Sequence, residues 1–166
     1  MIDLTSTPII ILAILGSVGV ALPVINIGLK EKGSVISYGY VTLIALFASI
    51  GYVLYQLALD HVAPAALFSQ DVLVDDAFGA LFAIAMLIVA IFTTVGSFNY
   101  MKNKDNPSIY FSLILLSAIG MVLVAYSTDL VMLFIAWELM SIPTYILVGF
   151  LKKDPISNEA AIKYFL

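Results

Sequence analysis

The sequence contains no cysteine, no arginine and a single histidine, His61. Without cysteine the chain cannot form a disulfide, a cysteine-ligated metal site or an iron–sulfur cluster, and one histidine excludes a conventional multi-histidine metal site. Basic residues are few, since seven lysines stand against eleven acidic residues, for a formal net charge of −4. Because nucleic-acid binding needs a basic surface to meet the phosphates, this balance argues against nucleic acid as a partner.

Charged residues of both signs are scarce in the chain. They make up 11% of it, against 63% hydrophobic residues and a mean hydropathy of +1.12. A soluble domain has roughly 45–50% apolar and about 25% charged residues. This chain has too few polar side chains to cover its surface in water, so the composition predicts an integral membrane protein.

Five stretches are long and apolar enough to cross the roughly 30 Å of bilayer hydrocarbon, which takes about 20 residues of helix. They are residues 8–29, 36–59, 77–100, 109–126 and 130–150. A last helix, with Ser157 or Asn158 as the expected cap, covers only about half a crossing before the sequence stops. The predicted fold class is all-α integral membrane, with five transmembrane helices plus the start of a sixth. We therefore expect the N-terminal fragment of a longer protein.

The loops between these stretches alternate in charge. Six of the seven lysines lie after the first, third and fifth stretches, whereas the opposite loops hold aspartates and no lysine. The positive-inside rule then places the lysine loops in the cytoplasm and the N-terminus outside. If the number of predicted spans were wrong by one, this alternation would be lost. The loop charges therefore support the number of spans independently of hydropathy. In the longest loop, residues 60–76, the stretch VLVDDAF is expected to lead into the third helix as a short extended piece.

Small side chains recur at helical spacing in two of the stretches. Ala13, Ser17 and Ala21 form one stripe, and Ser117 and Gly120 share a face of the fourth stretch. Small residues let membrane helices approach closely, so both sets are expected to be packing surfaces.

An acidic side chain lies near the middle of the fifth stretch. Glu138 follows Leu130 by eight residues and precedes Phe150 by twelve. A charge at this depth costs on the order of 2.5–3.5 kcal/mol, which a partner, a watery cavity or protonation normally offsets. A carboxyl group that can be neutral or charged suits a proton relay. The alternative is a structural role, with the carboxyl group hydrogen-bonded to another helix.

The neighbours of Glu138 predict a polar face and a weakened backbone. Ser141 and Tyr145 follow it at helical spacing, so their hydroxyl groups are expected to hold water or to bond the carboxyl group. Pro143 has no N–H, which leaves the carbonyl group four residues earlier without its helical partner. In lipid that carbonyl needs another donor, so we expect local hydration over residues 138–143.

Lys163 is the only lysine outside the loops. Glu159 lies four residues before it, an order that favours an exposed ion pair on the helix surface. The side chain could also extend to the membrane surface. The functional interpretation is a cation that reaches towards the plane of Glu138 and modulates its proton affinity.

Residues 129–166, DLVMLFIAWELMSIPTYILVGFLKKDPISNEAAIKYFL, resemble the antiporter-like membrane subunits of respiratory complex I. The residues that carry the likeness are Glu138, Tyr145, Lys152, Lys153, Asn158, Glu159, Ala160, Ala161, Lys163 and Tyr164. The match is closest to the N subunit, or chain 2, family of NADH:quinone oxidoreductase.

The resemblance implies a larger fold in which three leading helices precede two inverted five-helix repeats. Residues 1–106 would hold the three leading transmembrane helices, and residues 107–166 the beginning of the first, truncated repeat. Glu138 would be the glutamate of the family's fifth helix and Lys163 the lysine early in its sixth. Together they would form a proton relay, with Ser141, Tyr145 and Pro143 in support.

The resemblance also implies a non-redox subunit of a proton-pumping NADH:quinone oxidoreductase in the plasma membrane of a prokaryote. Its partners would be the lipid bilayer and the other membrane subunits. No catalytic, cofactor-binding or metal site is expected in this chain. NADH, flavin, iron–sulfur clusters and quinone would belong to the partner subunits.

Several alternatives stay open on the sequence alone. A homologous subunit could serve a deazaflavin-coenzyme dehydrogenase or a membrane-bound hydrogenase. A multisubunit cation/proton antiporter would use such a chain without redox chemistry. A non-transporting scaffold would keep Glu138 dry and hydrogen-bonded in every state.

Overall fold

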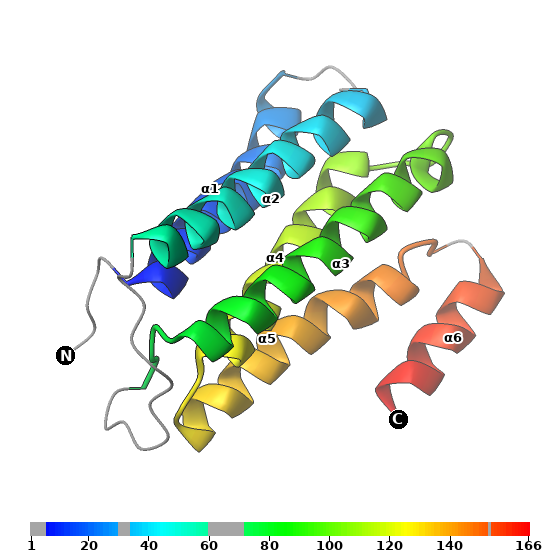
Figure 1. Ribbon diagram of the computed structural model, residues 1–166. Coiled ribbons are helices and arrows are strands. Elements are labelled where there is room, and N and C mark those ends of the chain that lie inside the picture. The colour runs from blue at the N-terminus through cyan, green and yellow to red at the C-terminus, as the bar shows by residue number, and fades with distance from the viewer. Residues whose placement is uncertain (1–5, 30–33, 60–71, 153) are drawn as a thin grey trace.

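The computed structural model describes residues 6–29, 34–59, 72–152 and 154–166. Over these residues it contains six helices, which run alternately up and down (Figure 1). Their bounds are α1 Thr7–Leu29, α2 Val35–Ala58, α3 Ala77–Met101, α4 Pro107–Tyr126, α5 Leu130–Val148 and α6 Pro155–Phe165. The first five are long and apolar enough to cross a membrane, and each lies within two residues of its predicted bounds. The prediction of five spans plus a shorter sixth helix is confirmed.

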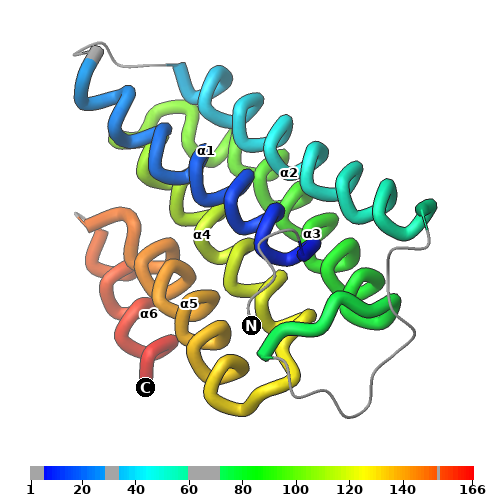
Figure 2. Tube along the Cα trace, turned by 90° about the vertical axis from the view of Figure 1, so that its left-hand side faces the viewer, coloured from blue at the N-terminus to red at the C-terminus, as the bar shows by residue number. Residues whose placement is uncertain are grey.

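Helix α4 is the central element of the bundle. It packs against α1, α2, α3 and α5, and Figure 2 shows it running behind α1 and alongside α5. Its side chains Phe111, Leu115 and Ala118 are fully buried, and they meet the buried Leu15 of α1 and Leu87 of α3 in one apolar core. The outer helices turn many large apolar side chains outward, as expected where lipid is the solvent.

The extended piece that leads into α3 is confirmed over residues 72–76. It pairs with the end of α4, because the N–H of Val74 donates to the carbonyl of Tyr126 at 3.0 Å. Asp75 then ties this piece to α1, since its Oδ2 accepts from the N–H of Thr7 at 2.8 Å. Asp76 caps α3 by accepting from the N–H of Gly79 at 2.7 Å. The rest of the predicted loop, with His61, lies outside the described residues.

Helix α6 begins earlier than expected. Asp154 caps it, accepting from the N–H of Ile156 at 3.1 Å, and Pro155 occupies the first helical position, where it costs no hydrogen bond. The prediction that Ser157 or Asn158 caps this helix is therefore wrong.

Both side chains instead bond the backbone that precedes α6, one at the end of α5 and the other in the α5–α6 loop. Ser157 donates to the carbonyl of Val148 at 2.8 Å, and Asn158 donates to the carbonyl of Lys152 at 3.2 Å. These two bonds satisfy backbone carbonyl groups near the end of the preceding span, which have no helical partner.

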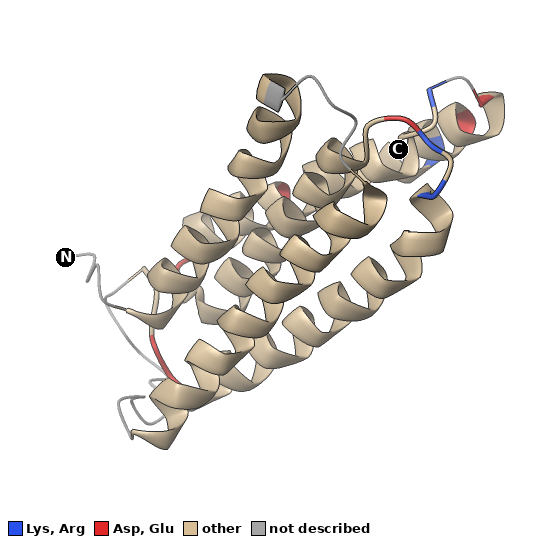
Figure 3. Cartoon of the chain, turned by 90° about the horizontal axis from the view of Figure 1, so that it is seen from above, with Lys and Arg blue, Asp and Glu red and all other residues tan. Residues whose placement is uncertain are grey.

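The two described lysine loops lie at the same end of the bundle. Tyr110 lies in the first turn of α4, just after the α3–α4 loop, and Phe150 lies in the α5–α6 loop. Their rings pack edge-on, with 5.1 Å between ring centres. Figure 3 shows blue segments gathered at one end, with the long helices almost entirely tan. Lys30, Lys32 and Lys153 lie outside the described residues, and the side of the membrane that these loops face stays a prediction.

Candidate functional site

The candidate site begins where α4 and α5 pack closely together, at Gly120. A Cβ atom added at Gly120 would lie 2.7 Å from the Cα of Met140 and 2.8 Å from the carbonyl carbon of Leu139. One turn away, the hydroxyl of Ser117 donates to the carbonyl of Met140 at 3.3 Å. The prediction that Ser117 and Gly120 form a packing surface is confirmed, and this surface meets the backbone directly after Glu138.

Glu138 is half-buried on α5, beside this close approach. Within the described part of the chain, no hydrogen bond or ion pair holds its carboxyl group. A carboxyl group in this position needs water, a proton or a group from outside these residues to offset its desolvation. The chain therefore supplies the acid and its position but not its partner.

The polar face predicted on α5 is buried only in part. Phe134, one turn before Glu138, is 65% exposed, whereas Ser141 is buried. The hydroxyl of Ser141 donates to the carbonyl of Trp137 at 2.8 Å, so it bonds its own helix rather than the carboxyl group of Glu138. Serine in a helix interior commonly makes this bond to the carbonyl four residues earlier.

Pro143 is buried inside α5, where it removes one backbone donor as predicted. The hydroxyl of Ser117 approaches this weakened turn but bonds the carbonyl of Met140 rather than that of Leu139. Thr144 adds a further bond, because its hydroxyl donates to the carbonyl of Ser141 at 2.7 Å. The expected hydration of residues 138–143 stays a prediction.

Aromatic rings join α5 to α6. The ring of Tyr145 packs edge-on against Tyr164 and Phe165, with ring centres 5.4 and 5.5 Å away. A Cβ atom added at Gly149 would lie 2.9 Å from that of Ala161, so the helices are also close near the loop. This cluster was not predicted, although a tyrosine next to a phenylalanine in the last turn of α6 is a signal for it.

These contacts fix the register between Lys163 and Glu138. Gly149 faces Ala161 and Tyr145 faces Tyr164, so Lys163 lies level with about residue 147. That level is about nine residues from Glu138, or roughly 13 Å along the helix axis. Tyr145 lies between the two levels, and the structure does not bring the lysine and the glutamate together.

Lys163 instead pairs with Glu159, as its spacing indicates. The Nζ of Lys163 lies 2.7 Å from the Oε1 of Glu159, and the two side chains are 74% and 66% exposed. An ion pair this exposed is worth about 0–1 kcal/mol, so it restrains the lysine only weakly.

The described residues contain no group of three or more histidine, cysteine, aspartate or glutamate side chains that could hold a metal ion.

Comparison with known proteins adds independent observations. Residues 127–166 match the family model described as NADH:quinone oxidoreductase/Mrp antiporter, TM. NADH-quinone oxidoreductase subunit N 1 of Solibacter usitatus is 37% identical over 161 residues, which cover 96% of this chain and 31% of that protein. F(420)H(2) dehydrogenase subunit N of Methanosarcina mazei is 37% identical over 100 residues, which cover 60% of this chain and 20% of that protein.

A solved structure shares the fold. One chain of respiratory complex I from Thermus thermophilus with bound aureothin matches with a TM-score of 0.70 at 24% identity, over 93% of this chain and 32% of that chain. The helical bundle and the match over its last two helices define a multi-pass, antiporter-like membrane subunit. Over 96% of its length the chain is similar to a subunit N of NADH:quinone oxidoreductases. It spans about a third of the length of the Solibacter relative, at 31%.

Proposed function

We propose that this chain is part of a proton-translocating membrane subunit of a complex I-type NADH:quinone oxidoreductase. The relationship to subunit N and the family match over α5 and α6 support this proposal. The chain would carry no redox step, and NADH, flavin, iron–sulfur clusters and quinone would be bound by partner subunits. Residues 1–106 would be its leading helices and residues 107–166 the start of its first repeat, packed against the other membrane subunits in a prokaryotic plasma membrane.

The observation that carries the mechanism is the half-buried carboxyl group of Glu138, which has no partner among the described residues. Such a group can accept a proton from water that enters from the lysine side and pass it on. Pro143 would help by keeping the turn after Glu138 short of one backbone hydrogen bond, which favours local water.

Lys163 would act on Glu138 electrostatically and at a distance. When its ammonium group leaves Glu159 and turns towards the α5 side, it favours the charged form of Glu138 and so promotes proton release. The exposed ion pair with Glu159 is weak enough to exchange in this way. Because about two and a half helical turns separate the two groups along the axis, the hydroxyl of Tyr145 and intervening water would link them.

The experiment that tests the proposed function measures acidification in inverted membrane vesicles that contain the full-length protein in its native complex. NADH should drive proton uptake, and an uncoupler should abolish it. Sodium/proton counterflow without any electron donor would contradict the proposal and indicate the multisubunit antiporter. The subunits that co-purify provide a second readout, and flavin and iron–sulfur subunits that oxidise NADH are expected.

A second candidate rests on the Methanosarcina relative, which is an F(420)H(2) dehydrogenase subunit. In that case the same proton path would be driven by a deazaflavin donor. Vesicles that acidify with reduced deazaflavin coenzyme and not with NADH would favour this candidate.

A further inference from the structure

A cavity of about 340 Å³ opens at the lysine end of the bundle, away from Glu138. Its walls come from three places in the chain: Asn26 near the end of α1, the first turn of α2 from Ser34, and the α3–α4 loop with Lys102 and Lys104. Its volume is at the lower end of the roughly 300–1,000 Å³ typical of small-molecule sites.

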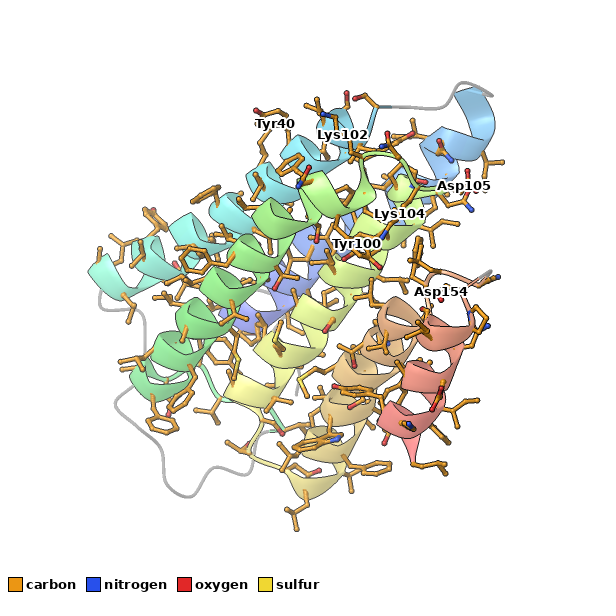
Figure 4. All side chains as sticks on the ribbon, turned by 90° about the vertical axis from the view of Figure 1, so that its right-hand side faces the viewer. Tyr40, Tyr100, Lys102, Lys104, Asp105 and Asp154 are labelled. Carbon is orange, nitrogen blue, oxygen red and sulfur yellow. The ribbon has the colours of Figure 1, made fainter. Side chains whose placement is uncertain are left out.

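The cavity carries positive charge that the described residues do not neutralise with an ion pair. Lys102 and Lys104 both line it, and Figure 4 shows them on the α3–α4 loop with Asp105. In the described ranges neither ammonium group lies within 4.0 Å of a carboxylate oxygen, that of Asp105 included. Lys104 instead lies over the ring of Tyr100, 3.0 Å from its centre, which restrains it beside the cavity.

The remaining polar groups of the wall add hydrogen-bond donors. The Oδ1 of Asn26 accepts from the hydroxyl of Tyr38 at 2.7 Å, which leaves the amide N–H₂ of Asn26 as its donor group. Helices α2 and α4 both begin at the cavity, at Ser34 and Asn106, and the side chain of Asn106 does not cap α4. The hydroxyl of Ser34 caps α2 by accepting from the N–H of Ile36 at 3.3 Å, so α4 is the helix that begins here without a side-chain cap. The N-terminus of α4, the amide of Asn26 and two ammonium groups, beside the single carboxylate of Asp105, are together the chemistry that recognises a phosphate.

The apolar surroundings of the cavity indicate where such a phosphate comes from. The cavity lies where four of the long apolar helices begin or end, and Ile36 in its wall is 58% exposed. On α1, Val24 and Ile25 just before Asn26 are 60% and 50% exposed. A phosphate held here would have apolar side chains of α1 and α2 beside it, along which acyl chains can lie. We propose that this cavity binds the phosphate head group of an anionic phospholipid.

The proposal is tested on the full-length protein purified with its complex in mild detergent and titrated with phosphatidylglycerol, phosphatidylcholine or inorganic phosphate. Bound lipid is counted by native mass spectrometry. The double variant Lys102→Gln/Lys104→Gln should bind phosphatidylglycerol roughly thirtyfold more weakly, as expected for two lysines near an anionic lipid. Lys152→Gln, in the α5–α6 loop, is the matched control and should bind like the parent. Lys102→Arg/Lys104→Arg should retain most of the binding.

Three results would overturn the proposal. Equal binding of phosphatidylglycerol by the parent and the double glutamine variant would show that the cavity is not the site. An equal loss in Lys152→Gln would show diffuse attraction to the whole lysine end. Binding of inorganic phosphate with the same dependence on Lys102 and Lys104, without any binding of phosphatidylglycerol, would make a free anion the occupant. None of these binding measurements depends on Glu138 or on proton pumping, so the lipid site and the proposed function are tested separately.

Discussion

At the scale of single residues, Gly120 determines how closely α4 and α5 pack beside Glu138. Any side chain there would meet the backbone of Leu139 and Met140, which cannot turn aside as a flexible side chain can. We expect Gly120→Ala to destabilise the protein by about 1–3 kcal/mol, as other overpacked interiors do. Thermal unfolding in detergent, followed by circular dichroism, measures the effect.

Gly51→Ala is the matched control for this substitution. Gly51 lies within α2, and a Cβ atom added to it would meet nothing within 4 Å. Alanine in this position should keep or slightly raise stability, since it favours a helix more than glycine does. Equal melting temperatures for Gly120→Ala and the parent would show that α4 and α5 do not pack as described.

Glu138 and Lys163 show what single residues in the sequence can and cannot reveal. The depth of Glu138 follows from its distance to the ends of an apolar stretch, so its position inside the fifth span was predictable. Its distance from Lys163 was not, because that depends on the register of α6 against α5. The contacts of Tyr145 and Gly149 determine that register, and they place Lys163 nearer the loop than the predicted relay needs.

At the scale of elements, α5 combines a buried proline with tight packing against α4. Pro143→Ala would restore a backbone N–H to the turn after Glu138 and so remove the reason for water to enter it. We expect the variant to be at least as stable as the parent, while amide hydrogen exchange over residues 138–143 slows roughly tenfold or more. Unchanged exchange would contradict the hydrated turn.

Helix bounds were predictable from hydropathy, whereas the packing face was predicted correctly on α4 but not on α1. Five apolar runs were enough to predict α1 to α5 because a membrane span must satisfy its backbone internally. The small-residue stripe predicted on α1 is largely exposed at Ala13 and Ser17, and Ile11 and Leu15 form the buried face instead. In a helix that is apolar all round, composition does not reveal which face meets its neighbours.

At the scale of the whole molecule, proton entry from the lysine side requires the lysine loops to face the cytoplasm. Single cysteines introduced into a cysteine-free background can test this with a membrane-impermeant maleimide. Lys152→Cys lies in the α5–α6 loop and Thr128→Cys in the α4–α5 loop, at the opposite end of α5. The first should react only in inside-out vesicles and the second only in right-side-out vesicles, since the positive-inside rule predicts that orientation. The reverse pattern would show that the orientation is wrong.

The most direct measurement is NADH-driven proton uptake by the assembled complex that carries Glu138→Gln. Glutamine keeps the shape of the side chain and cannot gain or lose a proton. Proton uptake should fall roughly tenfold or more, as when a proton-transfer group is removed, while NADH oxidation with an artificial acceptor is unchanged. Glu138→Asp should restore part of the uptake. Uptake at the parent rate in Glu138→Gln would contradict the claim that this carboxyl group relays protons.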